Sequence, residues 1–169
     1  MELNYLFNEE VSNRKELSNK LKEIGFDLEY EIGVIGVVFD KDGKVVYQRR
    51  GPESSGDYNK LSDMGGAVED SDVSFRDALL RELIEEGGNN FIVNFEDFLF
   101  AFVKNYFDIR LNKVIDRVFL VYKLKLVDGE FIINEPGKAL GYEKYNLDSV
   151  PVDEMMETSL FIREFYLKK

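Results

Sequence analysis

The 169-residue sequence contains no cysteine and no histidine. Without cysteine, a disulfide framework and thiol chemistry are both excluded. Without histidine, the commonest general base and the imidazole metal ligand are missing, so acid–base or metal chemistry falls to carboxylates, Lys, Tyr or water. No apolar stretch approaches the roughly 20 residues of a membrane helix, and residues 1–10 show no signal-peptide pattern. We therefore expect a cytoplasmic protein without a membrane partner.

Positive charge is also scarce, because 22 Lys and Arg stand against 33 Asp and Glu, giving a net charge of −11. Proteins that bind DNA or RNA polymers usually present a basic patch, so polymeric nucleic acid is not an expected partner. A small nucleotide stays compatible with this charge, because a bound divalent cation inverts the local sign. The length and the 44% hydrophobic content suit one globular domain with a substantial core.

Hydrophobic periodicity and turn residues predict helices over 12–24, 74–87 and 153–167. Strands are expected over 31–39, 44–50, part of 61–68, 91–106 (one or two strands) and 114–127, with 131–134 pairing back. This order predicts an α/β fold in which helices cover a mixed sheet. We expect residues 1–30 to form an N-terminal helical extension and residues 31–169 to form the main domain. The first helix has one apolar face, which would pack on the domain or on a second subunit, so a homodimer is open.

Three carboxylates share one face of the middle helix, because Glu82, Glu85 and Glu86 are spaced i, i+3 and i+4. Like charges at this spacing repel each other unless a cation neutralises them. Hard divalent ions such as Mg²⁺ bind a few carboxylates together with substrate phosphates. The pattern therefore indicates a helix that holds metal against a phosphorylated ligand, whereas an isolated acidic helix face would simply be solvated.

The segment from Gly65 to Gly88 resembles the Nudix box. That signature runs Gly, five residues, Glu, seven residues, then Arg-Glu-apolar-any-Glu-Glu-any-Gly-apolar. The matching residues are Arg81, Glu82, Leu83, Glu85, Glu86 and Gly88, preceded by the pair Gly65 and Gly66. Counted from Gly66, the first acid falls at Asp72, and one extra residue separates it from Arg81; Glu69 and Asp70 are the alternatives. Asn89 occupies the final apolar position.

The resemblance implies a Nudix-type α/β/α sandwich and a hydrolase that cleaves nucleoside diphosphates linked to another moiety. Candidate substrates are nucleoside triphosphates, oxidised nucleotides, nucleotide sugars and ADP-ribose. By the same resemblance, Glu82, Glu85 and Glu86 would hold Mg²⁺ or Mn²⁺, and the carbonyl of Gly66 or Gly65 would complete the coordination. Arg81 would orient the glutamates through bidentate hydrogen bonds.

Further site residues lie outside the box. Glu143, in a stretch that resembles the loop before the last Nudix helix, is the candidate base or extra ligand, and Glu135 is a weaker competitor. Arg49 and Arg50 end a strand that borders the substrate cleft in the family, so they are candidates for phosphate contacts or, equally, charges that protect a sheet edge. Weaker candidates with equally plain structural explanations are Lys60, Tyr47, Phe102, Tyr106 and Arg117.

Two other functions compete with the hydrolase. The extra residue before Arg81 and the polar Asn89 would suit a Nudix-like module that binds a nucleotide without cleaving it. A structural protein with an acidic surface and a dimerising N-terminal helix is the third. The hydrolase predicts turnover, the binding module predicts ligand-dependent stabilisation without product, and the structural protein predicts neither.

Overall fold

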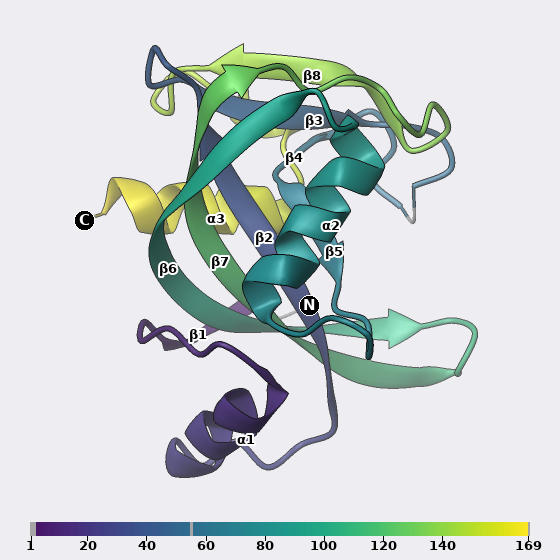
Figure 1. Ribbon diagram of the computed structural model, residues 1–169. Coiled ribbons are helices and arrows are strands. Elements are labelled where there is room, and N and C mark those ends of the chain that lie inside the picture. The colour runs from purple at the N-terminus through teal and green to yellow at the C-terminus, as the bar shows by residue number, and fades with distance from the viewer. Residues whose placement is uncertain (1–2, 55, 169) are drawn as a thin grey trace.

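The computed structural model describes residues 3–54 and 56–168, and in this part of the chain three α-helices enclose a mixed sheet (Figure 1). The helices are α1 (Arg14–Glu23), α2 (Phe75–Gly87) and α3 (Glu157–Leu167), and a 3-10 helix covers Val152–Glu154. The strands are β1 (Leu3–Phe7), β2 (Tyr30–Phe39), β3 (Val45–Arg50), β4 (Leu61–Ser62), β5 (Met64–Ala67), β6 (Phe91–Asp108), β7 (Lys113–Gly129) and β8 (Ala139–Tyr145). No helix among the described residues has the length and apolar character needed to span a bilayer.

The sheet runs in the order β1-β6-β7-β2-β3-β4. β6 and β7 form a long antiparallel hairpin, and β7 then runs parallel to β2. The end of β2 pairs with β3, whereas residues 33–36 of β2 pair with β5. β8 pairs with the opposite edge of β3. β3 and β5 thus branch from β2. α2 packs against β5, and the last turns of the helix, rather than its start, lie at this branch.

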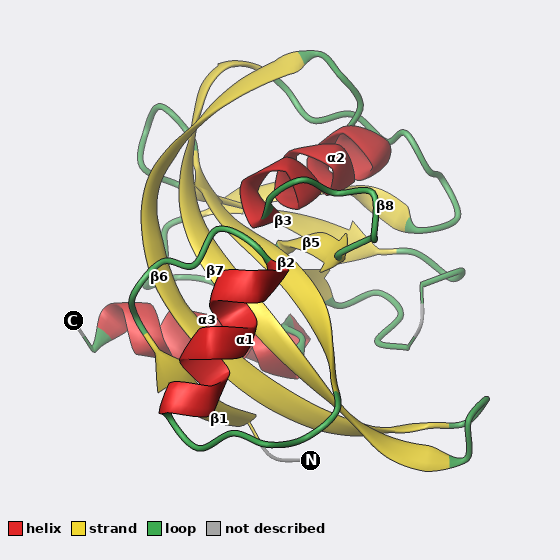
Figure 2. Cartoon of the chain, turned by 60° about the horizontal axis from the view of Figure 1, so that its bottom comes forward, coloured by secondary structure: helices red, strands yellow, loops and turns green. Residues whose placement is uncertain are grey.

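Two apolar layers hold the helices to opposite faces of the sheet (Figure 2). One layer contains Leu21 of α1 and Leu79 and Leu83 of α2. The other contains Ile162 of α3 together with Tyr47 of β3. This arrangement confirms the predicted α/β/α sandwich with a mixed sheet.

The three predicted helices are confirmed with shifted boundaries. α3 begins at Glu157 and not at Asp153, because residues 152–154 form the separate 3-10 helix. Asn13 rather than Ser12 precedes α1, and its side chain accepts a hydrogen bond from the Glu16 amide at 3.0 Å. Ser74 caps α2 as predicted, accepting from the Asp77 amide at 3.1 Å. The helix ends at Gly87 and is followed by Gly88, whose φ of 77° is one that glycine adopts without strain.

Three expectations differ from the structure. The prediction that 131–134 pairs back as a strand is wrong: this segment instead bonds to the end of α2, with the Ile132 amide donating to the Gly87 carbonyl at 2.9 Å. Glu143 lies in a strand, β8, and not in a loop. The strand β1, which pairs with β6, was not predicted, so residues 1–30 contribute a sheet strand as well as a helix.

Candidate active site

The acidic face of α2 is turned toward the branch of the sheet. Phe75, Leu79 and Leu83 are fully buried and pack on the sheet, and this packing fixes the rotation of the helix. Glu82 and Glu86 are consequently half-buried at the edge of the packed layer, whereas Glu85 is exposed. The packing therefore shields Glu82 and Glu86 partly from solvent and leaves Glu85 in solvent.

The glycine pair on β5 lies directly beneath these side chains. Gly65 has φ of 154°, and a side chain there would collide with the backbone of Val34 and Ile35. A Cβ on Gly66 would lie 2.6 Å from Oε1 of Glu82. The Glu82 carboxylate thus occupies the space that the missing Gly66 side chain leaves, which explains why glycine is needed at both positions for this packing.

Arg81 organises the acids around it. Its guanidinium donates two hydrogen bonds of 2.9 Å to Asp72, one to the Ala67 carbonyl at 2.9 Å, one to Glu82 at 3.0 Å and one to Glu85 at 3.2 Å. The hydrogen bond from Arg81 holds the pKa of Asp72 below its ordinary value. Among the three acids considered from sequence, Asp72 is therefore the one that makes the bidentate pair, despite the extra residue in the loop.

Glu86 is the most strongly perturbed of the three glutamates. Burial, together with the charge of Glu82, raises the pKa of Glu86 to about 8, and the amide of Gly65 opposes this rise. Burial likewise raises the pKa of Glu82, against the effect of Arg81. Both carboxylates are thus unfavourable as anions where they stand, and a bound cation would relieve that cost.

Two cations and a fourth acid complete the surroundings of this cluster. The charge of Arg50 acts on Glu86, and that of Lys138 acts on both Glu86 and Glu82. Glu135 adds negative charge near Glu86 and binds Lys138 at 2.8 Å. Lys138 was not predicted, because no periodicity or motif in the loop 130–138 connects it to α2.

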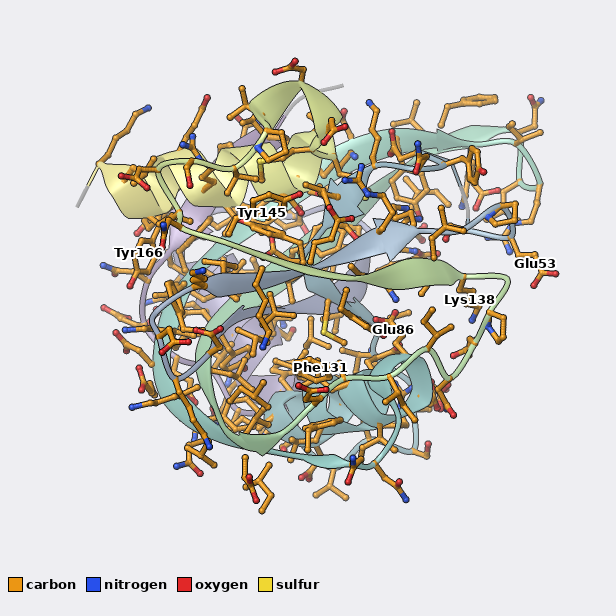
Figure 3. All side chains as sticks on the ribbon, turned by 90° about the horizontal axis from the view of Figure 1, so that it is seen from above. Glu53, Glu86, Phe131, Lys138, Tyr145 and Tyr166 are labelled. Atoms are coloured by element: carbon orange, nitrogen blue, oxygen red, sulfur yellow. The ribbon has the colours of Figure 1, made fainter. Side chains whose placement is uncertain are left out.

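Arg49 and Glu143 lie on the other face of the sheet. Glu143 lies opposite Tyr47, which belongs to the apolar layer under α3. Arg49 contacts Glu154, just before α3, at 3.4 Å. Arg49 binds Glu143 through two hydrogen bonds, of 2.6 and 2.8 Å, which hold the pKa of Glu143 below its ordinary value. Figure 3 shows the same division: Tyr145, which donates to Glu143 at 2.6 Å, lies on the α3 side of β8, and Glu86 lies on the α2 side. The structure does not bring these two predicted residues to the glutamates.

The weaker sequence candidates are also placed elsewhere. Tyr47 and Phe102 are buried in the core beneath α3. Tyr106 and Arg117 bind Glu31, at 2.9 and 2.6 Å, at the far end of the β6–β7 hairpin. Lys60 pairs with Asp57 at 3.5 Å.

The residues around α2 suit a hard divalent ion, although they do not form an assembled cage. In the two described stretches, 3–54 and 56–168, no three acidic side chains converge as a metal site. Oε2 of Glu86 is nonetheless buried without a hydrogen-bond partner, and the donor set around it is made of carboxylate oxygens. The chemistry of these donors therefore fits a hard divalent ion, provided that the carboxylates turn toward it.

Comparisons with known proteins agree with this fold. A family model described as the NUDIX domain matches residues 29–167, which leaves β1 and α1 outside the match. Among solved structures, the MutT NUDIX hydrolase from Burkholderia pseudomallei is 20% identical, with a TM-score of 0.62 over 81% of this chain and 98% of that chain. The MutT protein from Methanosarcina mazei Go1 is 20% identical, with a TM-score of 0.61 over 84% and 95% of the two chains. The NUDIX domain of Shewanella oneidensis NrtR, crystallised with ADP ribose, is 18% identical, with a TM-score of 0.63 over 84% and 89%. No curated protein sequence matches significantly.

Proposed function

Because the chain belongs to the Nudix family, we propose that it is a metal-dependent hydrolase that cleaves a diphosphate linkage in a nucleoside diphosphate derivative. The observation that carries this proposal is the half-buried pair Glu82 and Glu86, which Arg81 and two glycines hold in place although their charges repel. A protein without use for a cation gains nothing from that repulsion. The NrtR domain bound to ADP ribose supports a nucleotide-type ligand for this fold.

Glu82, Glu85 and Glu86 would hold the ion, with the Gly66 carbonyl and Glu135 as further oxygen donors. Once bound, Mg²⁺ or Mn²⁺ would neutralise diphosphate charge and make a water molecule more acidic. Arg50 and Lys138 would add positive charge against the phosphates, from β3 and from the loop before β8. Arg81 is saturated by Asp72, Ala67 and the glutamates, so its part is to position them.

A substrate panel tests the proposal. Nucleoside triphosphates, oxidised nucleotides, nucleotide sugars and ADP-ribose would be incubated with Mg²⁺ and with Mn²⁺, and products would be resolved by mass with oxygen-labelled water. We expect at least one substrate to be cleaved at its diphosphate, and Glu82→Gln to abolish this turnover. Glu164→Gln is the matched control, because Glu164 is exposed on α3, across the sheet. Cleavage that survives Glu82→Gln would contradict the assignment.

A second candidate function is nucleotide binding without cleavage. The extra residue between Asp72 and Arg81, together with Asn89 at the final apolar position of the box, favours it. It predicts that a member of the same panel raises the melting temperature while no product forms at any metal concentration. Any labelled product that depends on Glu82 excludes this candidate.

A further inference from the structure

Gln48 is a buried polar residue beside the glutamate cluster. It lies on the α2-facing side of β3, between Val46 and Arg50, and only 4% of it is exposed. Its neighbour across the sheet on β4 is Ser62, and its neighbour on β8 is Tyr142. Residues opposite each other in antiparallel strands point to the same face, so these three side chains form one row under α2.

Two polar atoms of this row, and one of Glu86 on α2, have no hydrogen-bond partner in the part of the chain that the structure describes. Among the described residues, Nε2 of Gln48, Oγ of Ser62 and Oε2 of Glu86 are all buried without a hydrogen bond. A buried polar atom left in this state costs about 1–3 kcal/mol. The three atoms are complementary, because the amide nitrogen can only donate, an ionised carboxylate oxygen can only accept and the hydroxyl can do both.

Tyr142 connects the row to Glu86. Its hydroxyl donates to the backbone carbonyl of Glu86 at 2.8 Å. Burial raises the pKa of this hydroxyl, and the Gln48 side chain opposes the rise. Arg50 is the next residue of β3 on the α2-facing side, and its charge acts on the Glu86 carboxylate itself. Gln48 therefore has two neighbours, Tyr142 and Arg50, that both interact with Glu86.

We propose that Gln48 is a positioning residue for Glu86: its carboxamide N–H group, directly or through one buried water, holds Oε2 of Glu86 and leaves the other oxygen free for a metal ion. The proposal rests on the proposed function, because it assigns Glu86 to metal binding. An amide donor suits this position better than a cation would. It holds one oxygen without neutralising the carboxylate, and the charge stays available for the ion.

The test measures Mn²⁺ binding to the full-length protein in the absence of substrate, by electron paramagnetic resonance. Gln48→Leu removes the donor and keeps the volume, and we expect Mn²⁺ to bind about 10-fold more weakly, as when other groups that orient ligands are lost. Turnover should recover when Mn²⁺ is raised by the same factor. Tyr122→Phe is the matched control, since it also removes a buried unpartnered atom, but from the core between Phe95 and Phe98.

The outcomes are separable. A merely structural role for Gln48 would change the melting temperature and leave Mn²⁺ affinity alone, and unchanged affinity in Gln48→Leu overturns the inference. If Gln48→Leu does not fold, Gln48→Met gives the same decision, because it too lacks the donor. Wild-type protein that binds no Mn²⁺ and cleaves nothing overturns the proposed function together with this inference. Wild-type binding with loss in Glu82→Gln but not in the Gln48 variants overturns only the inference.

Discussion

Replacing Gly66 with alanine tests whether the Glu82 carboxylate needs its observed place. The new Cβ would lie 2.6 Å from Oε1 of Glu82, whereas ordinary contacts begin near 3.4 Å. The carboxylate must therefore move by about 1 Å, because contacts closer than the van der Waals optimum are repulsive. It is the mobile end of a long side chain, so the backbone need not yield.

The cost to folding and the cost to function should separate. Displacing Glu82 weakens its hydrogen bond with Arg81, a loss of about 1 kcal/mol in the free energy of unfolding. A misplacement of about 1 Å in a reacting site can lower the rate about 100-fold. We therefore expect Gly66→Ala to melt within a few degrees of wild type and to lose about 100-fold in kcat/KM and much of its Mn²⁺ affinity.

Thermal melting, steady-state kinetics and Mn²⁺ titration measure the three quantities on one preparation. Gly141→Ala on β8 is the control, because a Cβ at Gly141 meets nothing within 4 Å. Wild-type kcat/KM and Mn²⁺ affinity in Gly66→Ala would refute the reasoning, since the carboxylate would then tolerate displacement. Equal loss in both variants would show that the effect belongs to glycine substitution in general.

Three further predictions address neighbouring features. Gly65→Ala should lower the free energy of unfolding by several kcal/mol, as forced backbone outliers do, because its Cβ would meet main-chain atoms at φ of 154°; chemical denaturation measures this, and a loss below about 1 kcal/mol contradicts it. Burial raises the pKa of Asp63 to about 7, so the folded state holds a proton that the unfolded state releases, and stability falls as pH rises from about 4 to about 7. Asp63→Asn should remove this fall, with melting temperatures equal to wild type near pH 4 and higher near pH 8; a constant difference between the two proteins would be the contrary result. Glu143→Gln should cost about 1–2 kcal/mol of stability by weakening the pair with Arg49, yet change kcat/KM less than about threefold, and a loss comparable to that of Glu82→Gln would place Glu143 in the site after all.

The regular parts of the fold were accessible from sequence because each is encoded locally. Ser74 and Gly88 delimit α2, and the spacing of Phe75, Leu79 and Leu83 sets its buried face. The hairpin turn was equally local, since Gly43 has φ of 77°. Residues 131–134 were misassigned because their apolar character also suits packing against the end of a helix, a contact that depends on tertiary structure.

The candidate site was only partly accessible. Glu82, Glu85 and Glu86 follow from helical spacing, and the arginine pairing follows from the motif. The partner of Arg81 was ambiguous, because a loop of this length can bring any of its acidic residues next to the arginine. Only the folded loop shows that the partner is Asp72. Lys138 reaches the cluster through long-range packing, which no local pattern reports.

The alternation of side chains along β3 has a consequence for how arginine roles are transferred between related chains. Arg49 and Arg50 are adjacent in sequence, but they serve opposite sides of the molecule, one tied to Glu143 and the other near Glu86. A single-residue offset in an alignment would exchange them and assign a phosphate contact to a residue that fastens the α3 layer. Pairing partners across the sheet, such as Gln48 with Tyr142, are therefore the safer reference when strands of distant relatives are compared.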